Sequence, residues 1–222
     1  RDNAWLRRSE AGWSLAPTIF GALRAARCVE QHGDEWRLIV DAPLSSLQLG
    51  VPASLQGLIL ARLDRLPERA RLTLKVASVI GRVFEGDLLA AAHPARPDPA
   101  TLAAQIELFQ QREFARLDNG ERLPVYIFKH NITQEVVYAT LLELQQQELH
   151  LAVAQALEAQ QPAALERLAY HYQQSDVGQP PVRAKALQYL EAAARRAQRD
   201  YANETALRYY RSALALAEQT PW

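Results

Sequence analysis

The sequence predicts a mainly α-helical protein with one small β-hairpin. Apolar residues recur at helical spacing through most of residues 51–222. Inside this region, Asn119-Gly120 separates two short runs with strand character, and the pair favours a tight hairpin turn because both residues tolerate positive φ. Near the C-terminus, "KALQYLEAAARRA" (185–197) matches "TALRYYRSALALA" (205–217) at an offset of 20 residues. The expected order is therefore helices, a hairpin and then repeated helices.

Two helices are expected at the start of this region. Residues 52–66 have helical spacing, and Pro52 suits the first turn, where its missing N–H would have no partner in any case. The apolar face of this helix would consist of Leu55, Leu58, Ile59, Leu63 and Leu66. Pro67 ends the helix and can open the next one, which Gly81 is placed to terminate. The apolar stripe of the second helix comprises Leu72, Val76, Val79 and Ile80.

The following elements complete the order of a known domain type. A short helix is expected around residues 86–92, and the prolines of "HPARPDPA" (93–100) predict a loop. The apolar face of a fourth helix consists of Leu102, Ile106 and Phe109. Residues 114–128 then supply the two strands of the hairpin. Three or four helices followed by a β-hairpin is the order of a winged-helix domain, which we expect over residues 51–147.

The remaining residues, 148–222, predict helical repeats. Ala206 and Ala213, with Tyr210 between them, have the positions at which tetratricopeptide helices place small and large side chains for close packing. One full repeat and a degenerate partner are visible, so we expect the array to continue beyond Trp222. Tyrosines are dense here, and we expect most of them to lie in the core and one or two to line a groove for a partner. These tyrosines are Tyr170, Tyr172, Tyr189, Tyr201, Tyr209 and Tyr210.

Composition narrows the possible functions. Lys+Arg and Asp+Glu balance at 25 each, which argues against a protein whose main task is to neutralise a phosphate backbone. Cys28 is the only cysteine, so no internal disulfide can form. No apolar run approaches the ~20 residues that cross a bilayer, and the start of the chain lacks a signal-peptide pattern, so we expect a cytoplasmic protein. The sequence has no Met, even at position 1, and we therefore expect it to be a piece of a longer protein.

No catalytic or metal site is predicted. His32 lies in an expected turn, His93 in the proline loop, His150 within a helix and His171 between two tyrosines of another helix. None of them forms the i, i+4 histidine pair of a zinc site. A Gly-x-Ser-x-Gly nucleophile motif is missing, and no acid and base are set up in one cleft. We therefore expect neither enzymatic activity nor a cofactor in this chain.

Several motifs, in a consistent order, resemble one family. "VPASLQGLILARLDRLPERARLTLKVASVIGRVFEGDLLAAA", "YIFKHNITQEVVYATLLELQQQELHLAVAQALE" and "LAYHYQQ" are similar to the region that follows the NTPase core in STAND signalling ATPases. The likeness is to those that accompany bacterial class III adenylate/guanylate cyclases and large LuxR-type regulators, and it covers roughly residues 9–220. It implies the tail of a helical lid over 1–50, a winged helix over 51–147 and helical repeats over 148–222. The Walker A loop is missing from this chain, so ATP or ADP and Mg²⁺ are expected only in a parent protein.

The resemblance implies two residues that sense nucleotide. Lys129-His130-Asn131 stands where the family has a Met-His-Asp motif whose histidine reaches the β-phosphate of ADP. Leu15-Ala16-Pro17 keeps only the proline of a Gly-x-Pro motif that lies near the adenine. Independently of the family, Asn131 can cap the helix that follows, with Gln134 completing a capping-box-like pattern. The alternative for His130 is a hydrogen bond to a backbone carbonyl in the core of its own domain.

The function that the resemblance implies is regulatory. The chain would couple the nucleotide state of its own NTPase core to an effector domain, a cyclase or a transcription regulator, and its helical repeats would bind a protein or a small ligand. Membrane partners are not expected. One alternative is a winged-helix DNA-binding domain, although the candidate recognition helix, 102–112, carries one Arg and three Gln against one Glu. The other is a helical-repeat adaptor, whose partner binding would survive removal of residues 1–50.

Overall fold

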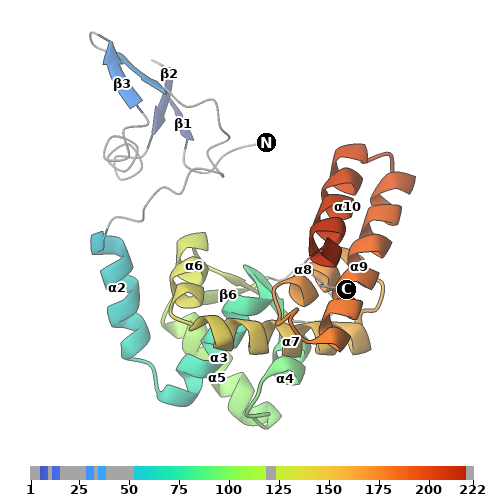
Figure 1. Cartoon of the computed structure of the whole chain (residues 1–222). Helices are drawn as coiled ribbons and strands as arrows, with labels where there is room; N and C mark the ends of the chain where they lie inside the picture. Colours follow the sequence, from blue (N-terminus) through green and yellow to red (C-terminus); the bar gives the residue numbers. More distant parts are fainter. Residues whose placement is uncertain are drawn as a thin grey trace. The chain divides into compact units, whose positions relative to one another are not determined.

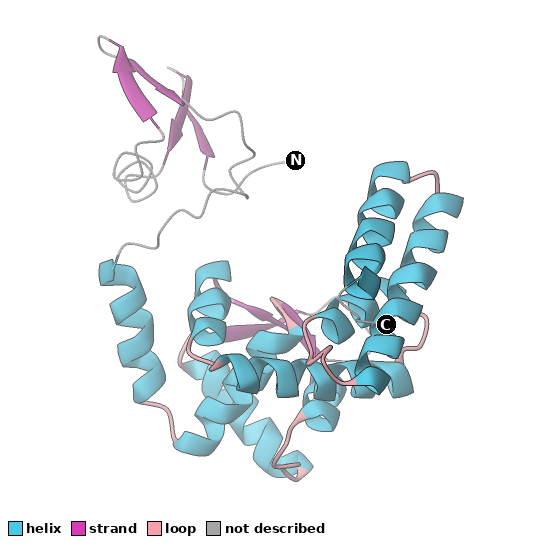
Figure 2. Cartoon of the chain, in the orientation of Figure 1, coloured by secondary structure: helices cyan, strands magenta, loops and turns pink. Residues whose placement is uncertain are grey.

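The structure of the chain is a computed structural model. It describes residues 6–9, 12–15, 29–32, 35–38, 53–118 and 124–218. The chain divides into two units, residues 1–61 and 62–222, which are described separately. The fold class is as predicted, because the described residues form nine helices and, in the second unit, one small antiparallel sheet (Figure 2). Among these helices, none is long and apolar enough to span a membrane.

The described backbone of the first unit contains two antiparallel hairpins before α2. They pair β1 (Leu6–Ser9) with β2 (Gly12–Leu15) and β3 (Val29–His32) with β4 (Glu35–Leu38). These strands differ from the helical lid expected over 1–50. The cause lies in the sequence: "EWRL" alternates polar and apolar residues, and Gly33-Asp34 between β3 and β4 is a hairpin signal. Pro17 and Cys28 lie outside the described residues, and the predicted domain boundaries stay predictions.

The helices and strands that follow have bounds close to those expected. They are α2 (Ala53–Asp64), α3 (Glu68–Ile80), β5 (Val83–Glu85), α4 (Gly86–Ala92), α5 (Pro99–Gln111), β6 (Ala115–Asp118) and β7 (Val125–Phe128). Gly81 ends α3 with φ of 135°, a value that favours glycine. Asp98 caps α5 by accepting a hydrogen bond of 2.9 Å from the Thr101 backbone N–H. On α2 the predicted apolar face is only partly correct, because Leu55 and Leu58 are exposed.

The sheet has three strands in the order β5-β7-β6, all antiparallel. The sequence predicted β6 and β7 but not β5, because three residues between two helices are too few to show a period. The predicted turn at Asn119-Gly120 lies outside the described residues. Four fully buried phenylalanines form the core beneath the strands: Phe84, Phe109, Phe114 and Phe128. Two of them, Phe84 and Phe128, contact each other with ring centroids 5.5 Å apart, which joins β5 to β7.

Helices make up the rest of the described chain. They are α6 (Asn131–Ala139), α7 (Glu143–Gln160), α8 (Leu165–Gln173), α9 (Pro180–Arg199) and α10 (Asn203–Glu218). Helix α9 packs against both α8 and α10, and Figure 1 shows α9 and α10 side by side. Both helices carry small buried residues, Ala186, Ala193, Ala194 and Ala197 on α9 and Ala206 on α10. Of the three positions at which the repeat predicts close packing, Ala206 is buried, Ala213 is half-buried and Tyr210 is exposed.

Most of the C-terminal tyrosines are not in the core, which contradicts the prediction. Tyr172 and Tyr189 are buried, whereas Tyr170, Tyr201 and Tyr210 are exposed and Tyr209 is intermediate. The spacing argument failed because a helical stripe is buried only where a neighbouring helix covers it. Tyr201 lies in the turn between α9 and α10, and it is 89% exposed.

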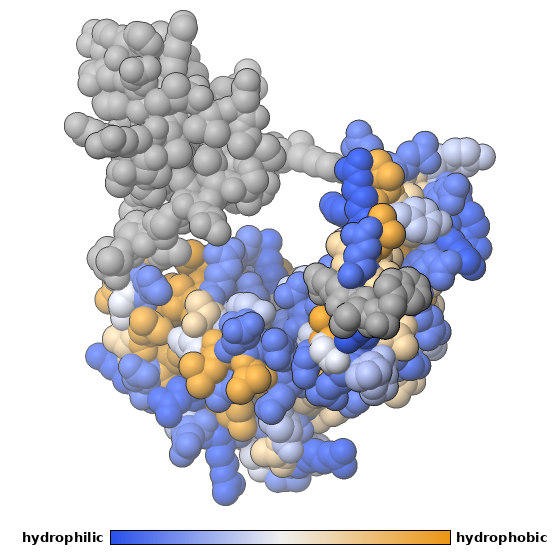
Figure 3. Space-filling view, in the orientation of Figure 1, coloured by the Kyte–Doolittle hydropathy of each residue, from blue (hydrophilic) through white to orange (hydrophobic). Residues whose placement is uncertain are grey.

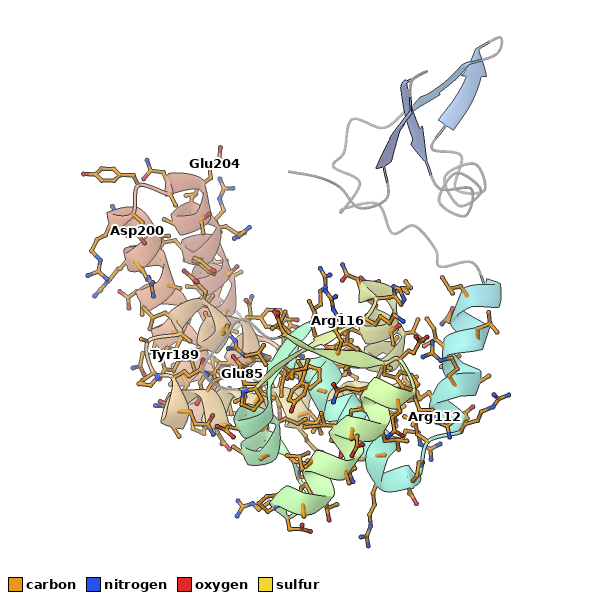
Figure 4. The ribbon with its side chains drawn as sticks, turned by 180° about the vertical axis from the view of Figure 1, so that it is seen from behind. Glu85, Arg112, Arg116, Tyr189, Asp200 and Glu204 are labelled. Atoms are coloured by element: carbon orange, nitrogen blue, oxygen red, sulfur yellow. The ribbon has the colours of Figure 1, made fainter. Side chains whose placement is uncertain are left out.

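Strand β5 and helix α4 join the sheet to the later helices. Helix α4 packs on α7, and Arg167 of α8 binds both carboxylate oxygens of Glu85, at 2.7 and 3.1 Å. Figure 4 labels Glu85 near the boundary between the green elements and the tan helices. Burial raises the pKa of Glu85, but the hydrogen bonds and charge of Arg167 outweigh burial and hold that pKa below its ordinary value. The ion pair therefore orients the two halves of the second unit.

Replacing Glu85 by Gln tests this junction. We expect Glu85→Gln to lower the free energy of unfolding by about 1–2 kcal/mol, because it leaves the half-buried Arg167 guanidinium without its counter-charge. The matched control is Glu191→Gln, which removes the exposed pair with Arg195 and should cost about 0.5 kcal/mol or less. Urea unfolding followed by circular dichroism measures both. Equal losses in the two variants would contradict the role of Glu85.

Candidate functional site

His130 lies at the joint between β7 and α6. The strand end is fixed from both sides: the Phe128 N–H donates to Arg82 O at 2.9 Å, and the Lys129 N–H donates to Phe114 O at 3.0 Å. His130 then takes an extended conformation, with φ of −135° and ψ of 137°, and serves as the N-cap of α6. Its side chain is exposed and makes no hydrogen bond within the described residues. The imidazole therefore lies at the surface, and the alternative of a bond to a core carbonyl does not match this geometry.

The predicted cap at Asn131 is wrong. Asn131 is the first residue of α6, and the N-cap position belongs to His130, whose carbonyl accepts from the Thr133 N–H at 3.0 Å. Gln134 does not close a capping box. Its amide donates instead to the carbonyl oxygen of Ser78 at 2.7 Å, and this bond ties α6 to the end of α3. The longer-range bond satisfies a carbonyl near the C-terminus of α3, where helical partners run out.

An ion pair lies beside the joint, between Glu113 and Lys129, the residue that precedes His130. The Lys129 Nζ lies 2.5 Å from the Glu113 carboxylate, and the Arg62 guanidinium lies 4.7 Å from the centre of the Phe114 ring. The hydrogen bond and charge of Lys129, with smaller contributions from Arg62 and His130, hold the pKa of Glu113 below its ordinary value. Two cations and an imidazole thus face one carboxylate. Together with the first N–H groups of α6, this surface is suited to an anion such as a phosphate.

Pro17, the second residue implied by the resemblance, lies outside the described residues. Only His130 of the two can be placed. In the part of the chain that the structure describes, no group of three or more His, Cys, Asp or Glu side chains is placed to bind a metal. The chemistry available at the joint is hydrogen-bond donation and positive charge.

The structure brings together two histidines that the sequence analysis left apart. The Nδ1 atoms of His150 and His171 are 2.9 Å apart, and the Tyr138 hydroxyl lies 3.1 Å from the Nε2 of His150. Both rings are buried. All contacts are satisfied with both rings neutral if Tyr138 donates to His150 and His150 donates to His171. Burial lowers the pKa of His150 to about 4, and burial with the nearby charges of His150 and Arg167 lowers that of His171 to about 3.

A second missed cluster centres on Glu158 of α7. Its carboxylate accepts from the hydroxyls of Tyr172 at 2.5 Å and Tyr189 at 2.7 Å, and it also binds the Lys185 ammonium. The two tyrosine rings stack with centroids 5.4 Å apart and an angle of 7° between their planes. The hydrogen bonds from Lys185 and Tyr172 lower the pKa of Glu158 to about 2, whereas burial and this carboxylate raise the pKa of Tyr189 to about 12. The cluster fixes α7, α8 and α9 against one another, and Figure 4 labels Tyr189 within it.

Comparisons with known proteins add no assignment. No family model, curated protein or solved structure gives a significant match to this chain. The role of each residue therefore rests on its chemistry and its place in the fold.

The buried histidine pair predicts a pH-dependent stability. Each folded-state pKa lies below the ordinary value of 6.5, so the stability that these rings contribute is complete above that pH and is lost as the pH falls towards 4. Between pH 7 and pH 5 we expect a loss of about 2 kcal/mol per histidine. Glu158 does not contribute in this window because its stabilisation is lost only between about pH 4.5 and 2.

Urea unfolding at a series of pH values measures this loss. The slope of the free energy of unfolding against pH should be clearly smaller in the double variant His150→Asn, His171→Asn. The control His130→Asn, which changes an exposed ring, should keep the wild-type slope. A double variant with the wild-type slope would show that other groups cause the pH dependence.

Proposed function

We propose that this chain is the non-catalytic regulatory region of a STAND-type signalling ATPase and couples nucleotide state to a cyclase or transcription output. The observation that carries the proposal is the exposed imidazole of His130 at the β7–α6 joint. It makes no side-chain hydrogen bond within the described residues, and it lies beside Lys129 and the N-terminus of a helix. Such a donor suits the β-phosphate of ADP bound to an ATPase core. A cytoplasmic location follows, where ATP and Mg²⁺ reach that core.

The mechanism is a two-state clamp. In the ADP state, His130 and the N–H groups at the start of α6 contact the nucleotide on the core and hold the winged helix against it. On exchange the contact is lost and the winged helix rotates away. The Glu85–Arg167 pair supports this mechanism, because it lets the sheet and helices α7 to α9 move together. A partner or small ligand on the helical repeats would then bias the same equilibrium.

The adaptor alternative has an observation in its favour. Leu207, Tyr210 and Leu214 lie one helical turn apart along α10 and are all exposed. Figure 3 shows apolar side chains along α10 among polar ones. In the internal repeat, Leu190 and Ala194 of α9 correspond to Tyr210 and Leu214, and both are buried. The equivalent face of α10 therefore has the character of a surface that another helix covers.

The DNA-binding alternative gains no comparable support. The exposed side of α5, its candidate recognition helix, carries Glu107, Gln110 and Gln111. Arg112 follows at the C-cap. One cation offers little attraction for a phosphate backbone.

Replacing His130 by Ala in a parent protein that contains the ATPase core tests the clamp. We expect His130→Ala to speed ADP release about tenfold or more, since a hydrogen bond to a charged phosphate is worth roughly 1.5–3 kcal/mol. Release of a fluorescent ADP analogue under stopped flow measures the rate. The control Glu135→Ala changes an exposed side chain on the same helix and should leave the rate unchanged. If the His130 variant also releases ADP at the wild-type rate, the clamp is wrong.

A further inference from the structure

A cavity of about 360 Å³ lies away from the His130 joint, between α3, the proline-rich segment 93–98 and the first turns of α5. Its size falls at the lower end of small-ligand sites. Three elements line it, and the segment between α4 and α5 is stiffened by two prolines, Pro94 and Pro97, with Pro99 opening α5. The cavity is therefore formed before any ligand arrives.

Two arginines line this cavity without partners. Arg69 comes from α3 and Arg96 from the proline-rich segment. Within the described residues, neither guanidinium forms a hydrogen bond or an ion pair. Asp98 also lines the cavity, but both its oxygens accept from Thr101, from the backbone N–H at 2.9 Å and from the hydroxyl at 2.6 Å. As a hydrogen-bond acceptor the carboxylate is thus committed to capping α5, and its negative charge remains beside the cavity. Among the described residues, the two guanidinium groups are the cavity's planar donors without a hydrogen-bond partner.

A buried hydrogen-bond network forms one wall and fixes a third donor. His93 is buried, and its Nδ1 accepts from the Ala95 N–H at 3.1 Å, so its Nε2 carries the proton and faces the Thr73 hydroxyl at 3.0 Å. That hydroxyl has a single proton and two acceptors, the Oε1 of Gln105 at 2.7 Å and the Arg69 carbonyl oxygen at 3.0 Å, and the shorter contact is to Gln105. Because the Gln105 oxygen is used, its amide NH₂ is left to donate to a ligand. Burial lowers the pKa of His93, so the imidazole is neutral at pH 7 and adds no charge.

The other side of the cavity is apolar. Leu72 lines it and also lines an adjacent depression of about 230 Å³ between α3 and α7. The apolar lining of that depression comes from Pro94, Leu141, Leu149 and Ala152, and its polar lining from Lys75, Gln145 and Glu148. A ligand with a charged end between the arginines would therefore find apolar surface on the far side of Leu72.

We propose that this cavity binds a small organic carboxylate with a short apolar tail. Arg69 and Arg96 hold the carboxylate, for which a guanidinium offers two parallel N–H groups, and Gln105 donates a further hydrogen bond. The tail crosses Leu72 towards Leu141. This site is separate from the His130 joint and does not depend on the proposed regulatory function.

Titration of the 222-residue chain tests the site. The probes are acetate, butyrate, hexanoate and inorganic phosphate at constant ionic strength, and the readout is the shift of backbone amide signals in ¹H–¹⁵N correlation spectra. We expect the carboxylates to shift the amides of residues 93–101, and Kd to fall about three- to fourfold for each added methylene. Phosphate, which has no tail, should bind more weakly than hexanoate.

Three variants locate the binding. The double variant Arg69→Gln, Arg96→Gln should bind hexanoate at least about tenfold more weakly. The matched control is Arg71→Gln. The Arg71 guanidinium is on the same helix but does not line this cavity, and it lies 3.6 Å from the Asp64 carboxylate. This variant should bind hexanoate as the wild type does. Leu72→Ala should reduce the dependence on chain length and keep acetate binding.

Any of three results overturns the proposal. They are no amide shifts with tens of millimolar of every probe, undiminished binding in the double variant, and phosphate affinity that equals or exceeds that of hexanoate.

Discussion

The Arg167–Glu85 ion pair is the interaction on which the arrangement of the second unit depends. It joins α8 to β5, two elements far apart in the sequence, and the side chains of Arg167 and Glu85 are 34% and 22% exposed. Two parallel hydrogen bonds fix an angle as well as a distance, which apolar packing between α4 and α7 alone does not do. A surface ion pair would add little. This one gives the sheet and the following helices a defined orientation, so a movement of one is carried to the other.

Polar groups specify the packing of the helices beyond this junction. Leucine and alanine faces tolerate small shifts of one helix along another, because an apolar contact has no direction. The His150–His171 contact and the Glu158 carboxylate do not tolerate them, since a displaced ring or hydroxyl would remain buried without a partner. Helices α7, α8 and α9 are therefore held in one register by side chains that contribute specificity more than stability.

The sequence predicted the helices well because hydrophobic periodicity is a local property. Pro67 and Gly81 were expected at helix ends and stand there, whereas Asn131, the expected cap, is the first residue of α6. The sequence did not predict β5, because this strand exists only through its pairing with β7. His150 and His171 had a signal that was not used. They lie nearly equally far along the chain from the break at Gln161, so two antiparallel helices bring them together. At the candidate site the position of His130 was predicted, whereas its neighbours Glu113 and Arg62 come from distant segments.

The basic groups of the described residues fall into those that pair with a carboxylate and those that do not. The chain has equal numbers of acidic and basic residues, and several of its basic groups are committed to carboxylates: Lys129, Arg167, Lys185 and Arg195. A single exposed arginine without a partner is merely solvated. Arg69 and Arg96 are also exposed, but both line one concave site together with Leu72, so their two charges can act on the same ligand. Their mutual repulsion is relieved when an anion lies between them.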